Sequence, residues 1–274
     1  MENSNAREEL KNSRRVVVKV GTSTLTYDNG EMNFARIEKL VRAISDLKNQ
    51  GRDMILVSSG AIGVGVGKLK LGSKPKDLRH KQAVAAVGQC ELMHIYGKFF
   101  QEYGHVVGQI LLTRDVVENE TGKVNVVNTF EALLEMGIIP VVNENDSVAV
   151  DEIESGIHRV FGDNDSLSAI VAKLVKADLL IILSDIDGFY DCDPRENENS
   201  KLISVIDEIT PEVEMCAGGE GSNRGTGGMI TKLTAAKIAT AAGINMVIAN
   251  GDNPKVIYDI LGGKTIGSLF VGRK

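Results

Sequence analysis

The stretch RRVVVKVGTSTLT, residues 14–26, joins a short apolar run to a small and polar continuation. The valines are continuous rather than alternating with polar residues, which is typical of a strand that is buried on both faces. Lys19 lies near the end of this run, and Gly21 follows, where the lack of a side chain lets a ligand approach the backbone. On this stretch alone, Lys19 is better interpreted as an edge-strand lysine whose charge reaches solvent.

Further apolar runs of strand length follow along the chain, at residues 54–57, 106–112, 138–142, 179–183 and 245–249. Apolar residues with helical spacing separate them, as in Phe34, Ile37, Leu40, Val41, Ile44 and Leu47. This alternation predicts an α/β fold, a three-layer αβα sandwich with a mostly parallel central sheet. Ligands of such sheets bind beyond the carboxyl ends of the strands, so functional residues are expected directly after these runs.

No internal repeat or linker divides the sequence, and we expect residues 1–274 to form a single domain with a flexible segment at 1–13. Residues 147–161 are polar with β-branched members, which indicates a hairpin. Residues 218–228, GGEGSNRGTGG, are rich in glycine and are predicted to be mobile.

The composition excludes several classes of protein. A net charge of −6 argues against a nucleic-acid partner, and no apolar run approaches the roughly 20 residues of a membrane span. The N-terminus lacks the apolar segment of a secretion signal, and Cys90, Cys192 and Cys216 are scattered without a Cys-x-x-Cys spacing. We therefore expect a cytoplasmic protein without a membrane partner. The histidines show no metal-binding spacing, and no protein-held metal is predicted.

Two predicted strand ends carry polar groups that suit an amino-acid ligand. Ser59, Gly60 and Ala61 follow the second run and open a helix, where free N–H groups attract anions, although on this stretch alone an ordinary helix cap is the better explanation. Asp146 follows the fourth run in NENDSV, and Asn164 and Asp165 begin a helix in FGDNDSLSA. Together these acids and amides can hold an ammonium group or position lysines.

Two more strand ends suit a phosphate. Ser184 and Asp185 follow the fifth run, and the glycine-rich GTGGMITK, residues 225–232, leads into a helix that carries Lys232 one turn inside. This arrangement can surround a phosphate with N–H groups and a cation. A P-loop is rejected, because Tyr258 stands where YDILGGKT would need its first glycine.

Taken together, the chain resembles the amino-acid kinase family, and within it the members that phosphorylate glutamate. The matching pieces are VVKVGTSTLT, VSSGAIGVG, NENDSV, FGDNDSLSA, LSDIDGFYDCDPR and GTGGMITKLTAAKIA, in the family's order. The resemblance implies ATP-dependent phosphorylation of the L-glutamate side-chain carboxylate to L-glutamyl 5-phosphate, the first step of L-proline biosynthesis, with ATP and Mg²⁺. It also implies a homo-oligomer, dimer or tetramer, with L-proline as feedback inhibitor. Many members carry a C-terminal PUA domain, which this chain is expected to lack.

The resemblance also implies roles for single residues. Lys19 and Lys232 contact the ATP phosphates, and Asp165 holds the two lysines in place. Ser59, Asp146 and Asn164 bind glutamate, and charge complementarity adds the N–H groups of the turn through Gly60 and Ala61. The nucleotide is contacted by Lys19, Ser184, Asp185, Thr226, Gly227, Gly228, Met229, Ile230, Thr231 and Lys232. Ser184 stands where the family often has threonine, and residues 147–161 form a longer stretch than usual.

The expected acceptor makes a general base unnecessary, because a glutamate carboxylate with a pKa of about 4.3 is already ionised at neutral pH. Two alternatives stay open at this point. The acceptor can be N-acetylglutamate, aspartate, carbamate or a nucleoside monophosphate, which have less use for Asp146 when they lack a free ammonium. The chain can also be a non-catalytic nucleotide-binding protein, for which both lysines would be dispensable.

Overall fold

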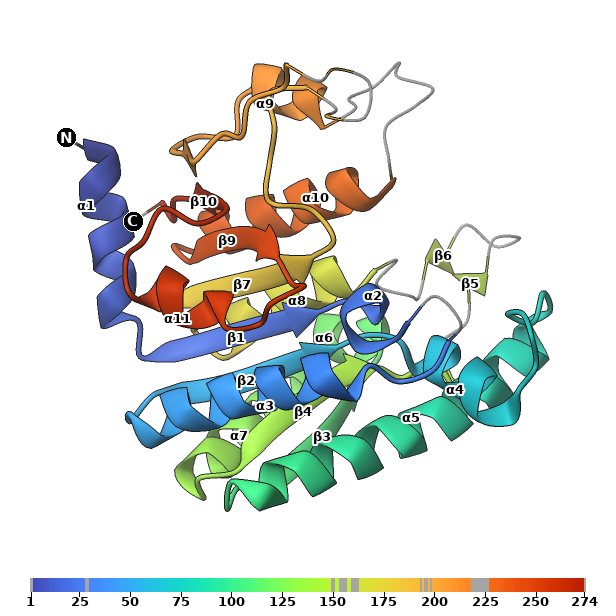
Figure 1. Cartoon of the computed structure of the whole chain (residues 1–274). Coiled ribbons are helices and arrows are strands. Elements are labelled where there is room, and N and C mark those ends of the chain that lie inside the picture. Colours follow the sequence, from blue (N-terminus) through green and yellow to red (C-terminus); the bar gives the residue numbers. More distant parts are fainter. Residues whose placement is uncertain are drawn as a thin grey trace. The chain divides into compact units, whose positions relative to one another are not determined.

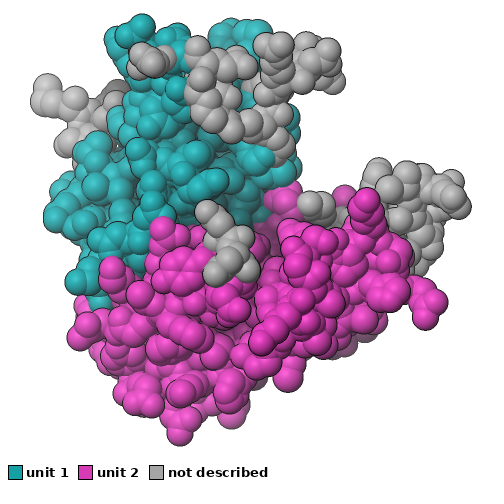
Figure 2. Space-filling view, turned by 45° about the vertical axis from the view of Figure 1, so that its right-hand side comes forward, with its two compact units in different colours: residues 1–19, 165–274 teal, residues 20–164 magenta. Residues whose placement is uncertain are grey.

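The computed structural model describes residues 2–27, 30–148, 151–152, 157–158, 163–192, 194, 197, 199–217 and 227–273. The chain divides into two compact units, shown in different colours in Figure 2. Unit 1 comprises residues 1–19 and 165–274, and unit 2 comprises residues 20–164. The chain therefore passes from one unit to the other at two peptide bonds, 19–20 and 164–165.

Unit 2 holds three parallel strands in the order β3-β4-β2. They are β2 (Asp53–Ser58), β3 (Val107–Leu112) and β4 (Ile139–Glu144), and the connecting helices are α3 (Phe34–Asn49), α5 (Leu78–Glu102) and α7 (Glu120–Glu135). The connection from β2 to β3 contains α5, and the connection from β3 to β4 contains α7 and crosses the strands in the opposite direction. Because both crossovers are right-handed, α5 and α7 lie on opposite faces of the strands. Figure 1 shows this arrangement, with α5 in front.

Local sequence explains where these helices begin. The side chains of Asn33, Asp77 and Asn119 each accept a hydrogen bond from the backbone N–H three residues further on. Such caps satisfy N–H groups that have no partner within the helix. Shorter elements complete the unit, namely α2 (Thr22–Leu25), α4 (Ala61–Leu69), α6 (Arg114–Glu118), β5 (Asp151–Glu152) and β6 (Ile157–His158).

Unit 1 holds five strands in the order β1-β7-β9-β10-β8. They are β1 (Arg15–Val20), β7 (Leu179–Ser184), β8 (Val205–Ile206), β9 (Asn245–Asn250) and β10 (Ser268–Phe270), and β1 ends where the chain crosses into unit 2. β7 and β9 are parallel, whereas β10 runs antiparallel to β9. The helices are α8 (Asn164–Leu174), α9 (Pro211–Cys216), α10 (Gly227–Ala241) and α11 (Val256–Leu261). Every residue of β7 is buried, which matches its continuous apolar sequence.

The predicted fold class, an α/β fold with a mostly parallel sheet, is confirmed. The predicted hairpin is present as the antiparallel pair β5 and β6, and the other residues of 149–162 lie outside the described residues. The glycine-rich residues 218–226 also lie outside them. That the two units count as a single domain stays a prediction.

The N-terminal segment differs from the expected flexible extension. It forms α1 (Glu2–Glu9) and the 3₁₀ turn η1 (Leu10–Asn12), and the Leu10 side chain is fully buried. The Arg7 guanidinium donates hydrogen bonds to the carbonyl oxygens of Ser204, Ile266 and Gly267, at 2.6, 2.6 and 2.9 Å. Polar composition concealed this anchoring, because one arginine and one leucine carry it rather than a periodic apolar stripe.

Helices α4 and α5 pack unusually closely, because glycines meet at their interface. A Cβ atom on Gly88 would lie 1.7 Å from the carbonyl oxygen of Ala61, and one on Gly65 would lie 2.1 Å from that of Val84. Ala61 is the first residue of α4, directly after the turn at Ser59 and Gly60. The close packing therefore fixes the position of that turn relative to α5.

We expect Gly88→Ala to lower the free energy of unfolding by at least about 1–3 kcal/mol, since the added methyl group forces the two helices apart. Gly97→Ala is the matched control on the same helix, because a Cβ there would meet no atom within 4 Å. Gly97→Ala should raise the free energy of unfolding by up to about 1 kcal/mol, because alanine has a higher helix propensity than glycine. Urea unfolding measures both, and equal stabilities of the two variants would contradict the expected clash.

Candidate functional site

A buried carboxylate in unit 1 pairs with two lysines. The Asp165 oxygens lie 2.5 Å from the Lys19 Nζ atom and 3.2 Å from the Lys232 Nζ atom. The exposed fractions are 3% for Asp165, 8% for Lys19 and 7% for Lys232, so the cluster is shielded from water. The predicted association of these three residues is therefore present in the structure.

Three elements bring this cluster together. Lys19 is the penultimate residue of β1, Asp165 lies in the first turn of α8, and Lys232 lies in the second turn of α10. The Lys232 ammonium also donates to the Gly228 carbonyl oxygen at 3.1 Å. The Thr231 hydroxyl lies 3.0 Å from an Asp165 oxygen and 2.9 Å from the same Gly228 oxygen, and its single proton can serve one of them at a time.

The charges in this cluster do not cancel. Burial opposes ionisation of the Asp165 carboxyl, but the positive charges of Lys19 and Lys232 outweigh it and hold its pKa below the ordinary value. The carboxylate is therefore ionised at neutral pH, and two positive charges face one negative charge. A buried surplus of positive charge favours binding of an anion, such as a phosphate group.

Unit 2 holds a second cluster, which is built of amides and hydroxyls. The Asn164 Nδ2 atom donates to the Ser59 Oγ atom at 2.8 Å and to the Asn143 Oδ1 atom at 3.0 Å, and it lies 3.1 Å from the Ser58 carbonyl oxygen. Asn143 belongs to the NEND stretch, but it was not among the residues predicted to bind a ligand. Its position at the end of an apolar strand was the available signal.

The turn that follows Ser59 depends on glycine. Gly60 has φ of +93°, which favours glycine, and a Cβ there would lie 3.2 Å from the Thr22 Oγ1 atom. The backbone then enters α4 at Ala61. The predicted Ser59, Gly60 and Ala61 therefore form a continuous strand-to-helix turn next to Asn164.

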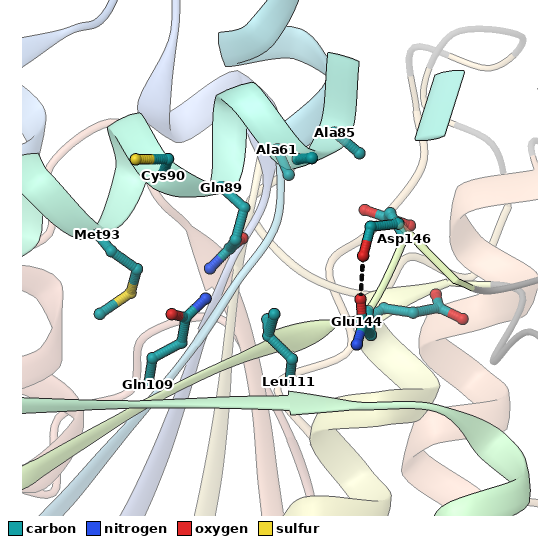
Figure 3. Close-up of a pocket in the computed structure, with 12 residues that line it drawn as sticks. Ala61, Ala85, Gln89, Cys90, Met93, Gln109, Leu111, Glu144 and Asp146 are labelled. Atoms are coloured by element: carbon teal, nitrogen blue, oxygen red, sulfur yellow. Dashed lines mark hydrogen bonds between the residues drawn. The ribbon is translucent and has the colours of Figure 1, made fainter. Parts of the chain in front are cut away.

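A pocket of about 370 Å³ opens beside this turn and is lined by Ala61, Gln89, Cys90, Met93, Gln109 and Asp146, among others. In the view of Figure 3, Asp146 lies at one end of the pocket, and Cys90 and Met93 lie at the other. Burial raises the pKa of the Asp146 carboxyl. A cationic partner would reverse this effect, because it favours the ionised form.

The predicted nucleotide residues lie at the end of β7 and at the start of α10. The Ser184 Oγ atom donates to an Asp185 carboxylate oxygen at 3.0 Å, and Asp185 is exposed. Gly227, Gly228, Met229, Ile230, Thr231 and Lys232 form the first turns of α10. Thr226 lies outside the described residues.

A model of the family described as "Amino acid kinase family" matches residues 14–250. The chain belongs to the amino acid kinase family. It is 67% identical over 268 residues to a protein of Clostridium perfringens (strain 13 / Type A) named glutamate 5-kinase, a match that covers 98% of this chain and 99% of that protein. It is 59% identical to a glutamate 5-kinase of Listeria monocytogenes, over 98% of this chain and 96% of the relative.

Solved structures of two other kinases share the fold. An isopentenyl phosphate kinase aligns with a TM-score of 0.66 at 16% identity and covers 94% of this chain and 100% of its own. The UMP kinase of Ureaplasma parvum aligns with a TM-score of 0.65 at 15% identity, over 94% of this chain and 98% of its own. At such low identity these structures establish the fold alone.

The individual roles of the family-type residues in this chain stay predictions. The structure brings Lys19, Asp165 and Lys232 into contact in unit 1, and it brings Ser59 and Asn164 into contact in unit 2. Among the described residues, no group of three or more His, Cys, Asp or Glu side chains is arranged to hold a metal ion. Over the same residues, no helix is long and apolar enough to span a bilayer.

Proposed function

We propose that this chain catalyses the ATP-dependent phosphorylation of the γ-carboxylate of L-glutamate to L-glutamyl 5-phosphate, the first step of L-proline biosynthesis from glutamate. The observation that carries the proposal is the buried cluster of Lys19, Asp165 and Lys232, with its surplus of positive charge. The high identity to relatives named glutamate 5-kinase, over nearly the full length of both chains, supports the same reaction.

The phosphoryl donor side requires cations in fixed positions. Phosphoryl transfer gains little from covalent chemistry, and positioned positive charges stabilise the transferring group and the departing ADP. Lys19 and Lys232 would supply those charges, and Asp165 would keep their ammonium groups apart and oriented. Ser184, Asp185 and the first turns of α10 would contact the nucleotide. Mg²⁺ would accompany ATP on its phosphate oxygens and neutralise part of their charge.

The acceptor side requires complementary groups for an amino acid. Asp146 would pair with the ammonium group, while Asn164, Ser59 and the N–H groups at Gly60 and Ala61 would bind carboxylate oxygens. The γ-carboxylate is ionised at neutral pH, so it can attack without a general base. Asn164 and Asp165 are consecutive in the chain, so one peptide bond joins the acceptor cluster to the cation cluster.

An acceptor panel tests the proposal. The purified chain is incubated with ATP, Mg²⁺ and one acceptor, and hydroxylamine traps any acyl phosphate as a hydroxamate. We expect a hydroxamate with L-glutamate and little or none with N-acetylglutamate or aspartate. ADP release with carbamate or a nucleoside monophosphate, in the absence of a glutamate product, would assign the chain to another acceptor. No turnover with any acceptor would support a non-catalytic role.

Asp146→Asn should raise the KM for glutamate about 10- to 100-fold and leave the KM for ATP nearly unchanged. The reason is the loss of a charge-assisted hydrogen bond to the ammonium group, which contributes about 1.5–3 kcal/mol. Initial rates measured against each substrate in turn give the two constants. An equal rise in both would remove Asp146 from the acceptor pocket.

Three finer features belong to the same proposal. L-Proline would compete with glutamate, since it carries the same α-carboxylate and a cationic amine but lacks the reacting group. Glutamate titrations at fixed proline concentrations test this.

A homo-oligomer, dimer or tetramer, is supported by exposed apolar side chains on α5 and beside the edge strand β3, such as Val87 and Val106. Analytical ultracentrifugation measures the number of chains in the oligomer. A cytoplasmic location is supported by three free cysteines.

A further inference from the structure

Gln89 is a half-buried residue of α5 that is bonded to the acceptor cluster without belonging to it. The Asn143 Nδ2 atom donates a hydrogen bond to the Gln89 Oε1 atom at 2.8 Å. Asn143 is only 1% exposed, so few water molecules can replace this partner. In Figure 3 the Gln89 side chain extends from α5 toward strand β3 and lines the pocket.

The remaining bonds of Asn143 fix the orientation of its side-chain amide. Its Oδ1 atom accepts from the Glu144 backbone N–H at 2.9 Å and from the Asn164 Nδ2 atom at 3.0 Å. A backbone N–H can only donate, so the Asn143 oxygen must face it and the Asn143 nitrogen must face Gln89. Without an acceptor at residue 89, this buried nitrogen loses the partner that holds the amide in place.

The chain of hydrogen bonds continues to the groups proposed to bind the acceptor. Asn143 accepts from Asn164, and Asn164 donates to the Ser59 Oγ atom at 2.8 Å. A second residue of α5, Tyr96, lies two helical turns after Gln89 on the same face, and its hydroxyl contacts the Ser58 Oγ atom at 2.9 Å. Helix α5 thus supports the ends of both β2 and β4.

Helix α5 is well suited to this task because it is held close to the acceptor turn. Gly88 precedes Gln89, and its missing side chain allows contact with the Ala61 carbonyl at the start of α4. A displacement of Gln89 would therefore require movement of the interface between α4 and α5. This rigidity holds Gln89 in one position, so that it can orient Asn143 and, through Asn143, Asn164.

We propose that Gln89 is a positioning residue for the phosphoryl acceptor, which holds Asn143 and through it Asn164 in the orientation that binds L-glutamate. The inference rests on the proposed function, because that function makes Asn164 and Ser59 ligands of the acceptor. Gln89 acts by accepting a hydrogen bond and needs no contact with glutamate itself. The nucleotide is bound by other residues, so its affinity does not depend on Gln89.

The first test compares three variants in steady-state kinetics. Gln89→Leu removes the acceptor oxygen and should raise the KM for glutamate about 3- to 10-fold, with the KM for ATP and kcat within about twofold of the wild type. Gln89→Glu keeps an oxygen that accepts from Asn143 and should stay within about threefold of the wild type. Gln101→Leu is the control and should match the wild type, because this exposed glutamine of the same helix lies outside the pocket and its side chain has no hydrogen bond among the described residues.

A double-mutant cycle decides whether Gln89 acts through Asn143. In the Asn143→Ala background, Gln89→Leu should have no further effect on the KM for glutamate. Additive effects would overturn the proposal. Equal losses in Gln89→Leu and Gln89→Glu would also overturn it, and so would a loss in Gln101→Leu as large as that in Gln89→Leu. Thermal unfolding without substrate identifies variants that are merely unfolded, and Gln89→Glu then carries the test.

A binding measurement separates this proposal from the proposed reaction. The upward shift of the unfolding temperature by glutamate measures binding without turnover, and Gln89→Leu should require about 3- to 10-fold more glutamate for the same shift. If glutamate stabilises the wild-type chain but no hydroxamate forms, the reaction is refuted, and the shift measured for Gln89→Leu still decides the role of Gln89. A wild-type chain that glutamate does not stabilise would overturn both.

Discussion

Replacing Lys19 or Lys232 with alanine is expected to lower kcat at least about 100-fold, with a modest effect on the KM for glutamate. Each change removes one of the two cations that face the Asp165 carboxylate at 2.5 and 3.2 Å. The transition state spreads negative charge over the transferring phosphoryl group and ADP, so the lost cation destabilises it more than the ground state.

A control for this prediction exists on the same helix as Lys232. Lys237 lies on α10, is 46% exposed along its side chain, and pairs with Glu214 at 2.8 Å. Because an exposed ion pair contributes little, Lys237→Ala should keep kcat within about twofold of the wild type. Folded Lys19→Ala and Lys232→Ala variants with near-normal kcat would refute the phosphoryl-transfer assignment. An equal loss in Lys237→Ala would show that the effect is not specific to the cluster.

Asp165→Asn is expected to resemble the lysine variants, with kcat lowered roughly 100-fold and the KM for glutamate little changed. The substitution keeps the shape of the side chain and removes its charge, so two buried ammonium groups lose the carboxylate that orients them. It should also lower the free energy of unfolding by about 3–5 kcal/mol, because a buried charge is left unpaired. Steady-state rates and urea unfolding measure the two effects.

The pH dependence of stability gives a second readout for Asp165. Burial raises the pKa of its carboxyl, but Lys19 and Lys232 lower it further, and the net shift is downward in the folded chain. A lowered folded pKa stabilises the protein above the unfolded value of about 3.9, and this contribution disappears as the pH falls through the folded pKa. As the pH falls through the folded pKa, the free energy of unfolding should therefore decrease less for Asp165→Asn than for the wild type. Urea unfolding at a series of pH values measures this difference.

The matched control for this substitution is Asp259→Asn. Asp259 pairs with Lys264 at 2.6 Å on the surface, where the side chains are 40% and 67% exposed. A screened pair of this kind contributes at most about 1 kcal/mol, so the control should leave rate and stability nearly unchanged. If Asp165→Asn raised only the KM for glutamate, its proposed role in holding the lysines would be wrong.

Local sequence patterns were sufficient to predict the main elements and the strand ends at which the candidate site residues lie. Continuous apolar runs predicted β1, β7 and β9, because strands buried on both faces need apolar residues at every position. Gly60, whose φ is +93°, marked a turn that favours glycine. These signals depend on neighbouring residues, so they are visible without knowledge of the rest of the chain.

Contacts between distant residues, in contrast, are set by the tertiary fold. Strand order brings Lys19 to Asp165 and Asp165 to Lys232, contacts that no local periodicity encodes. The anchoring of Arg7 by carbonyl groups of residues 204, 266 and 267 was missed for the same reason, and so was the bond between Asn143 and Gln89. A hydrogen bond between residues far apart in sequence leaves no pattern in either segment, because its partner is supplied by the fold.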